Sequence, residues 1–228
     1  MSNSDDTAQE TLRGLLHARH SCRAFRPDPV PRAVVEQILE DACRAPSWCN
    51  AQPWQVVVTS GDETEAFRQA MLNAFDTGHP NPDFPFPTGY SGPYKERRFT
   101  CGMQLYEAVG IERGDKDGRV RQMRENYRFF GAPHVAMIST ARELGPYGAL
   151  DCGGFITAFC LAAQAQGIAT VPQAAIAFYS DVVREHFDLG DDRMVLCAIS
   201  FGYADDTHPA NQFRTSRATL SQVVDWRD

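Results

Sequence analysis

The sequence lacks the signatures of several large enzyme classes. It has no G-x-G-x-x-G or Walker A segment, which argues against a Rossmann or P-loop nucleotide site, and no G-x-S-x-G of a serine hydrolase. Its six histidines are scattered, without an H-E-x-x-H motif or a Cys/His cluster, so no metal site is predicted. No run of about 18 uninterrupted apolar residues is present, which argues against a transmembrane helix.

Paired cysteines are also missing. Seven cysteines are spread from Cys22 to Cys197 with no C-x-x-C pair, and this odd number is typical of reduced thiols rather than of a disulfide framework. Residues 1–10 are polar and acidic, without the basic start and apolar centre of a signal peptide. We therefore expect a cytoplasmic protein with no membrane partner.

Lysine is scarce, since 20 of the 22 basic residues are arginine. The net charge of −7 argues against nucleic-acid binding, because neutralising the phosphates of a polymer requires a basic face. The arginines nevertheless form two basic islands. Residues 12–32 carry five arginines and one aspartate, and residues 207–219 carry two arginines and no acidic residue. Two small islands in an acidic chain favour a compact anionic ligand over a polyanion.

Hydrophobic periodicity predicts a single α+β domain in which helices sandwich a small sheet. The apolar fraction of 43% is that of an ordinary globular chain. Helices are predicted at 8–18, 31–44, 62–75, 94–110, 115–129, 151–166 and 181–188. Strands are predicted at 54–59, 134–140 and 194–203. We expect residues 1–9 to be flexible.

Three segments have an unusual composition. The helix at 151–166 has almost no polar face, so we expect it to be buried on all sides. The segment 77–94 contains five prolines, three glycines and aromatic residues that include Phe84 and Tyr90, a composition that favours an ordered loop covering a ligand. The tail at 204–228 has no helical period and too few apolar residues to close a domain by itself.

Two short constellations carry donors for a ligand. Residues 19–23, Arg-His-Ser-Cys-Arg, combine two guanidinium groups, a hydroxyl and backbone N–H groups that suit a phosphate, although a solvated surface would use the same residues. Residues 46–54, Pro-Ser-Trp-Cys-Asn-Ala-Gln-Pro-Trp, set two amides beside two indoles. A planar heterocycle would bond amides at its edges and apolar groups on its face, whereas a turn would need the same Pro and Asn for its own geometry.

Together these constellations resemble the nitroreductase family of FMN-dependent oxidoreductases. The family begins with Arg-x-Ser-x-Arg/Lys, matched at 19–23, and continues with Pro-Ser-x-x-Asn-x-Gln-Pro-Trp, matched at 46–54. Further blocks follow in the family's order, and the resemblance covers about residues 10–220. These blocks are Phe130–Pro133, Asp151–Gly153, Gly167–Ala175, Ser200–Tyr203 and Phe213–Arg217.

The resemblance implies an FMN site built from distant parts of the chain. It assigns Arg19 and Ser21 to the ribityl phosphate, and Arg23 to the pyrimidine N1–O2 edge, where positive charge stabilises the reduced ring. Arg128, or its neighbour Asn126, is implied to contact the same ring. The implied cofactor-binding residues are Arg19, His20, Ser21, Arg23, Pro46, Ser47, Asn50, Gln52, Arg128, Pro172, Gln173, Ala174, Ala175, Arg214 and Arg217.

The later blocks are implied to complete the same site. Ala174 and Ala175 would offer backbone N–H groups near flavin N5. Arg217, with Arg214, would return from the tail to the phosphate, which predicts that Arg19 and Arg217 lie close together. Some relatives have Lys-Ser-Arg where this chain has Thr-Ser-Arg, which leaves open whether Arg214 replaces a missing cation.

The resemblance also implies the fold, assembly and reaction. The sheet would be mostly antiparallel, and the protein would be a homodimer with two FMN sites in its interface. Residues 46–54 would reach the partner's flavin, and the tail at 204–228 would embrace the partner. NADPH or NADH would reduce the flavin, and a nitroaromatic or quinone acceptor would then take the electrons in a ping-pong reaction. No catalytic side chain is implied.

Acceptor binding is assigned to the loop at 77–94 as a candidate lid, with Trp48, Phe84 and Tyr90 as candidate contacts. Trp48 could equally pack in the dimer interface. Two alternative functions remain open from the sequence. One is a flavoenzyme of the same fold that catalyses reductive dehalogenation, enone or nitroalkene reduction, or flavin fragmentation. The other is a non-catalytic flavin-binding redox sensor.

Overall fold

The structure, a computed structural model, describes residues 3–227. This part of the chain contains seven α-helices and four β-strands, joined by loops and short 3₁₀ turns. The strands are β1 (Gln55–Ser60), β2 (His134–Ala141), β3 (Ala169–Gln173) and β4 (Arg193–Gly202). The helices are α1 (Asn3–Ala18), α2 (Arg32–Ala42), α3 (Asp62–Thr77), α4 (Gly92–Ala108), α5 (Lys116–Arg124), α6 (Gly145–Ala165) and α7 (Ser180–Phe187). Each predicted helix and strand has a counterpart among these elements.

The sheet is antiparallel throughout, in the order β1-β2-β4-β3. The prediction of three strands was wrong by one, because β3 was not recognised as a strand. β3 has only five residues and contains Pro172, which lies opposite Ile199 of β4. A proline cannot donate to the ladder and is therefore confined to edge strands such as this one.

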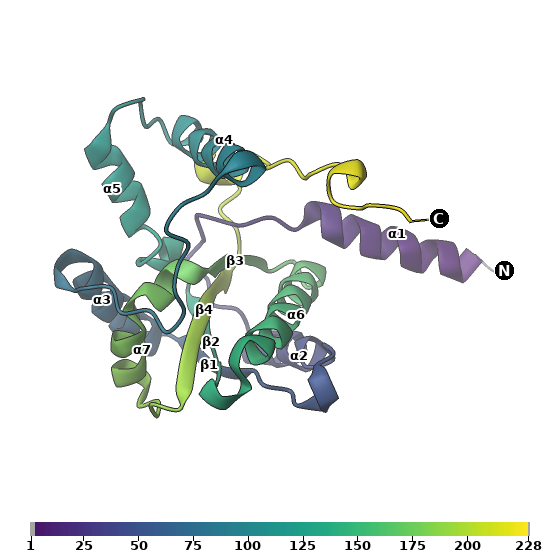
Figure 1. Cartoon of the computed structure of the whole chain (residues 1–228), viewed down its shortest axis with the longest axis horizontal. Helices are drawn as coiled ribbons and strands as arrows, with labels where there is room; N and C mark the ends of the chain where they lie inside the picture. The colour runs from purple at the N-terminus through teal and green to yellow at the C-terminus, as the bar shows by residue number, and fades with distance from the viewer. Residues whose placement is uncertain (1–2, 228) are drawn as a thin grey trace.

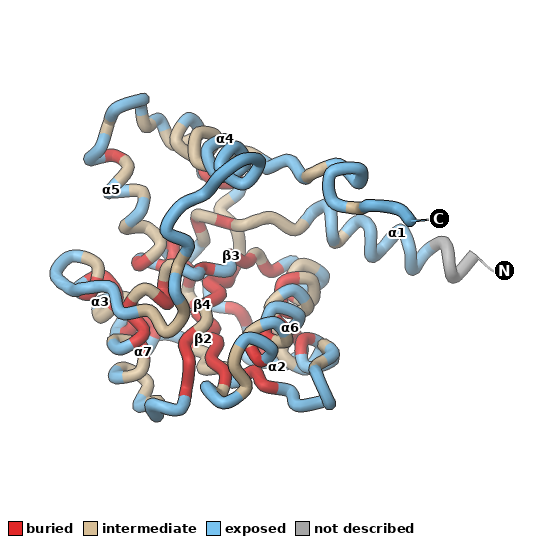
Figure 2. Tube along the Cα trace, in the orientation of Figure 1, coloured by how far each residue is buried: buried red, intermediate tan, exposed pale blue. Residues whose placement is uncertain are grey.

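Two helical layers enclose the sheet (Figure 1). On one face, α2 and α6 pack Ile38 and Phe155 against Ile138 of β2. On the other face, α3 and α7 form a second core in which Phe67 packs with Met137 of β2. Ile138 and Met137 are neighbours in β2 and serve opposite faces, because side chains alternate along a strand. The buried residues are concentrated in this region (Figure 2), and the α+β prediction with a sandwiched sheet is confirmed.

Helix α6 differs from its prediction in length and in burial. It begins at Gly145 rather than at residue 151. Phe155 is buried against the sheet, but Gly153, Gly154 and Thr157 are exposed. The expectation of burial on all sides is therefore wrong for the single chain, because only one side of α6 packs on the sheet and α2.

The same helix is the most apolar in the described residues. The stretch Arg142–Ala165 is long and apolar enough to cross a membrane by length and composition alone, with a mean hydropathy of 1.3 and a third of the window buried. Core helices of soluble proteins share this composition. Here Phe155 stacks on Trp54 beside β1 at a centroid separation of 5.3 Å, as in a helix that covers a sheet.

Three parts of the chain extend away from the sheet and its helical layers, namely α1, α4 and the C-terminal tail (Figures 1 and 2). Helix α4 has no buried residue, and Leu12 and Leu16 of α1 are exposed. The tail forms only two short 3₁₀ turns, Pro209–Asn211 and Leu220–Gln222, and leaves Trp226 exposed. These segments have little core of their own.

Two further predicted helix boundaries, in α1 and α5, need correction. Helix α1 begins at Asn3 rather than at residue 8, and residues 1–2, part of the segment expected to be flexible, lie outside the described residues. Helix α5 ends at Arg124 rather than at residue 129. Beyond it, Phe129 (φ 56°) and Phe130 (φ 53°) adopt a left-handed backbone that helices do not contain, and the chain then enters β2.

His134, at the start of β2, ties the sheet to the segment before α2. Its Nε2 accepts the N–H of Val30 at 2.9 Å, so the ring proton is on Nδ1, which donates to the carbonyl of Thr59 at 3.2 Å. Burial lowers the pKa of His134, although the hydrogen bond to Thr59 opposes the shift. The neutral ring is therefore the form that the fold requires.

Replacing His134 with glutamine should flatten the pH dependence of stability. Because the folded pKa lies below the ordinary value of about 6.5, the unfolded chain binds the additional proton, and the wild type loses stability as the pH falls through about 6.5. Thermal unfolding at about pH 7.5 and pH 5.5 measures this loss. The exposed His17→Gln variant is the control, and an H134Q variant that loses as much as the wild type on acidification would contradict the assignment.

Candidate functional site

The two basic islands meet at one cavity in the folded chain. Arg19 and Ser21 follow α1, whereas Arg214 and Arg217 lie in the tail, and all four line a cavity of about 380 Å³ that we call the arginine cavity. His20 and Arg23 line it as well. The predicted closeness of Arg19 and Arg217 is confirmed.

Backbone pairing with the sheet edge holds the N-terminal island in place. Ser21 forms a β-bridge with Thr170 of β3, and the N–H of Cys22 donates to the carbonyl of Thr170 at 3.0 Å. The outer side of an edge strand is free for such pairing. Arg19, Ser21 and Arg23 line the cavity together with His20, whereas Cys22 is fully buried.

The arginine cavity carries uncompensated positive charge. Among the described residues, Arg19, Arg23, Arg214 and Arg217 form no ion pair with a carboxylate; Arg23 donates to the carbonyl of Ser21 at 3.3 Å instead. Burial lowers the pKa of Arg23, because the charged guanidinium loses hydration. Several guanidinium groups without an acidic partner constitute a site for an anion.

His20 contributes a neutral group to the same cavity. Burial lowers the pKa of its ring, and its Nδ1 lies 3.1 Å from the carbonyl oxygen of Ala18. The positive charge of the cavity therefore comes from its arginines. Nowhere in residues 3–227 do three or more His, Cys, Asp or Glu side chains form a group that could hold a metal.

Asn211, which no sequence pattern singled out, fastens the two islands together. It is only 4% exposed. Its Oδ1 accepts the N–H of Arg23 at 2.7 Å, and its Nδ2 donates to the carbonyls of Ala24 and Asp205, both at 2.9 Å. A single asparagine in a polar tail has no periodicity that reveals such a role, and only the folded chain brings its partners together.

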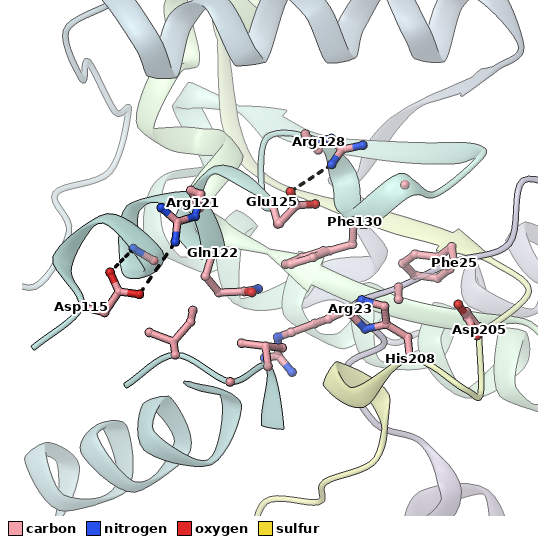
Figure 3. Close-up of a pocket in the computed structure, with 16 residues that line it drawn as sticks. Arg23, Phe25, Asp115, Arg121, Gln122, Glu125, Arg128, Phe130, Asp205 and His208 are labelled. Atoms are coloured by element: carbon pink, nitrogen blue, oxygen red, sulfur yellow. Dashed lines mark hydrogen bonds and ion pairs between the residues drawn. The ribbon is translucent and has the colours of Figure 1, made fainter. Parts of the chain in front are cut away.

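A second cavity of about 510 Å³, which we call the polar cavity, lies beside the first (Figure 3). Arg23 lines both cavities, so the two are adjacent. Phe130 and Arg121 both line the second cavity, and Arg121 pairs with Asp115 there (Figure 3). Arg128 also lines it and pairs with Glu125 at 3.1 Å, so the positive charge of Arg128 is partly compensated.

The end of β3 offers backbone groups rather than side chains. Gln173 is 3% exposed, and its Nε2 donates to the carbonyl of Asn126 at 2.7 Å while its Oε1 accepts a serine hydroxyl of β4. This side chain is therefore fully used within the protein. The neighbouring Pro172 and Ala174 are exposed and Ala175 is half-buried, which leaves their main chain accessible to a ligand.

The segment 46–54 folds into a tight turn on another part of the surface. Ser47 accepts the N–H of Gln52 at 2.9 Å, and both Asn50 (φ 56°) and Gln52 (φ 48°) have a left-handed backbone. These four predicted cofactor residues, which begin with Pro46, line neither the arginine cavity nor the cavity in Figure 3. Within one chain, the structure does not bring them to the arginines.

The three residues predicted to contact the acceptor do not line one common cavity. Trp48 is 57% exposed and packs edge-on against a tyrosine of α6, with ring centroids 4.5 Å apart. Tyr90 is exposed, with the guanidinium of Arg98 5.2 Å from its ring centroid. Phe84 lines a third cavity of about 290 Å³ together with Ala174, whereas Trp48 and Tyr90 do not line it.

Comparisons with known proteins match nearly the whole chain. The model of the Nitroreductase family matches residues 16–203. The nitroreductase NfnB of Mycolicibacterium smegmatis is 41% identical over 220 residues, which are 96% of this chain and 93% of that protein. A 4-nitrobenzoate reductase of a Nocardioides species is 35% identical over 222 residues, 95% of this chain and 90% of that protein.

A solved structure agrees with the sequence matches. The crystal structure of the FMN-dependent nitroreductase NfnB from Mycobacterium smegmatis in complex with NADPH superposes with a TM-score of 0.93 at 38% identity. The match covers 97% of this chain and 100% of that chain. The tail and the projecting helices therefore have counterparts in the solved structure.

Replacing Asn211 with alanine should lower the free energy of unfolding by about 1–3 kcal/mol, because buried backbone groups of Arg23, Ala24 and Asp205 lose their partner. Chemical denaturation at matched protein concentration measures the change. The Gln212→Ala variant, in the same turn but exposed, is the control and should change stability by less than about 0.5 kcal/mol. Equal destabilisation by the two variants would show that Asn211 does not fasten the islands.

Proposed function

The chain belongs to the nitroreductase family, and we propose that it is an FMN-dependent NAD(P)H oxidoreductase that reduces nitroaromatic or quinone-type acceptors. The observation that carries this proposal is the arginine cavity, where Arg19, Arg214 and Arg217 meet Ser21 without an acidic partner. The ribityl phosphate of FMN is a compact anion that such donors suit. The FMN-dependent relative with bound NADPH supports the same cofactor and NADPH as reductant.

We assign the phosphate of FMN to the arginine cavity and its pyrimidine ring to the polar cavity beside it. Arg19, Ser21, Arg214 and Arg217 donate to the phosphate, with Arg214 supplying the charge that Thr215 lacks. Arg23 belongs to both cavities, so it lies between the phosphate site and the polar cavity. In that position its charge favours the reduced state of the pyrimidine ring.

Two further groups complete the proposed cofactor site. Arg128 lines the polar cavity and would contact the pyrimidine ring there. Ala174 and Ala175 offer backbone N–H groups to flavin N5, and their small side chains allow the ring to approach the chain closely. Because the side chain of Gln173 is engaged elsewhere, only its main chain and that of Pro172 face the ligand.

When bound, FMN would supply the redox chemistry between NAD(P)H and the acceptor, in a ping-pong sequence. In balance, NAD(P)H, one proton and a nitroarene give NAD(P)⁺, a nitrosoarene and water. The residues of the chain bind and orient the reactants and tune the charge around the ring. We assign no side chain as a catalytic acid or base.

We further propose that the active protein is a homodimer. The exposed side of α6 at Gly154 and Thr157 is available to pack against a second copy. The turn at 46–54 is exposed at Pro46 and from Trp48 to Gln52, and in the dimer it reaches the partner's FMN. The tail at 204–228, which has little core of its own, embraces the partner. The exposed side chains of Leu12, Leu16 and Trp226 provide apolar surface for such an association.

A cytoplasmic location is supported by the thiols. All seven cysteines are free. Burial raises the pKa of Cys22 and of Cys152 to about 11, so both stay protonated and unreactive at neutral pH. Free thiols that pack as small apolar groups are typical of a reducing compartment.

The purified protein should be yellow, and excess NADPH without oxygen should bleach its visible flavin absorbance within seconds. Stopped-flow absorbance measures the rate, with free FMN and NADPH as the control for uncatalysed reduction. Addition of a nitroarene should restore the colour. Colourless protein that takes up no added FMN would contradict the proposal, whereas yellow protein that NAD(P)H does not bleach would favour the redox-sensor alternative.

Replacing Arg19 with alanine should weaken FMN binding by about 10-fold or more, because one charge-assisted contact to the phosphate is lost. Riboflavin has no phosphate, so its affinity should change little. Fluorescence titration of apoprotein measures both affinities. Arg13→Ala, which removes an exposed arginine of the preceding helix α1, is the control. Equal loss of FMN and riboflavin affinity in R19A would contradict the phosphate assignment.

A further inference from the structure

The third cavity, the apolar cavity, lies where the edge strand stops short of its neighbour. β3 pairs with β4 only as far as Gln173, opposite Ala198, so residues 193–197 of β4 have no strand on this side. The loop at 78–91, between α3 and α4, occupies this place. Without this loop, residues 193–197 of β4 would expose unpaired backbone groups on the side where β3 is absent.

The lining of this cavity is apolar and uncharged. Phe84–Pro87 of the loop face residues of β4 and α6 across about 290 Å³, and none of the twelve lining residues is charged. Burial raises the pKa of the one thiol, Cys197, to about 12, so it is neutral as well. Ala174 also lines the cavity, which therefore opens beside the turn that we assign to flavin N5.

A single buried carboxylate holds the loop that forms one wall. The side chain of Asp83 is 6% exposed, and it accepts the N–H of Val195 at 2.9 Å. Arg142 and Arg184 donate to the same carboxylate at 3.0 Å and 2.5 Å. Burial opposes ionisation, but these donors lower the pKa of Asp83, so it is charged and paired.

Further contacts fix the loop on either side of Asp83. The N–H of Asn81 donates to the carbonyl of Phe178 at 2.7 Å, and the N–H of Asp83 donates to the hydroxyl of Ser180 at 3.3 Å. Phe86 stacks on Phe178 with ring centroids 3.8 Å apart and an angle of 8°. The wall of the cavity is therefore a pinned part of the fold rather than a free loop.

We propose that the apolar cavity binds the uncharged aromatic ring of the electron acceptor, and that Asp83 is the positioning residue for its Phe84 wall. This inference rests on the proposed function, because it assumes that the turn at Ala174 lies beside the flavin. It also narrows that function, since it selects neutral nitroaromatics over those that carry a carboxylate.

Size and charge support this assignment. A volume of about 290 Å³ is at the lower end of the range of small-molecule pockets, which suits one small ring rather than a dinucleotide. A carboxylate in this cavity would lose its hydration and find no cation, because both arginines nearby are engaged by Asp83. A neutral ring meets Phe84 and the apolar side chains around it without such a penalty.

The first test compares 4-nitrobenzamide with 4-nitrobenzoate, two acceptors of similar size of which only the second is charged. The wild type should prefer the amide in kcat/KM. The Phe84→Arg variant should raise kcat/KM for 4-nitrobenzoate relative to the amide by about 10- to 100-fold, because the guanidinium pairs with the carboxylate. Thr88→Arg, in the same loop but outside the cavity, is the charge-matched control and should leave the ratio unchanged.

The second test replaces Asp83 with asparagine, which has the same shape but cannot neutralise the two arginines. KM for 4-nitrobenzamide should rise several-fold while kcat changes less, because the wall loosens but the flavin is untouched. Reoxidation by dioxygen, which needs no ring pocket, and FMN content should both match the wild type. If Asp83 had a merely structural role, kcat, the rate of reoxidation by dioxygen and the FMN content would all fall together in D83N. If D83N does not fold, the Phe84→Arg comparison alone decides.

The outcomes separate the inference from the function on which it rests. Protein that binds no FMN, or is not bleached by NADPH, contradicts the proposed function. Protein that turns over nitroarenes but shows no preference for the amide, and no change in F84R, contradicts only the inference. An F84R variant that is monomeric in size-exclusion chromatography while the wild type is dimeric would overturn it too, because the cavity would then belong to the contact with a second copy.

Discussion

The candidate site depends on one electrostatic constraint. Several guanidinium groups must be held close together in the arginine cavity although no carboxylate neutralises them. Two like charges about 8 Å apart repel by about 2 kcal/mol at an effective dielectric constant of 20, so the arginine cavity does not form by itself. Neutral hydrogen bonds offset this repulsion. Ser21 and Cys22 pair with Thr170 of the edge strand, and Asn211 clamps the N-terminal island to the tail. The charge remains available to a ligand because no internal carboxylate consumes it.

The shortness of β3 organises both ends of the site. Along its outer side the strand pairs with the N-terminal island, and this pairing holds Arg19, Ser21 and Arg23 at the arginine cavity. Where it ends, after Gln173, β4 continues alone, and the loop with Asp83 closes the gap and creates the apolar cavity. One edge strand thus borders both the arginine cavity and the apolar cavity, and the turn at Ala174 lines the second of them.

The parts that could be predicted from sequence are those with a period or a motif. Helices and central strands follow apolar spacing, and residues 19–23 match a short family motif. β3 was missed because it is short and contains Pro172. Asn211 and Asp83 were missed because each acts through partners more than 100 residues away in the sequence, and a single polar residue in a loop carries no pattern. The exposed side of α6 was mispredicted because composition does not tell which neighbour covers a helix.

The two anchors differ in charge for a physical reason. Asn211 fastens chain beside uncompensated arginines, where a carboxylate would pair with them and compete with a phosphate. A neutral amide provides the same number of contacts without doing so. Asp83 fastens a loop beside an apolar cavity, and there Arg142 and Arg184 neutralise the carboxylate on the side away from the cavity lining. In each case the choice of anchor preserves the electrostatic character of the neighbouring cavity, so the loops determine ligand choice while buried polar groups determine where the loops lie.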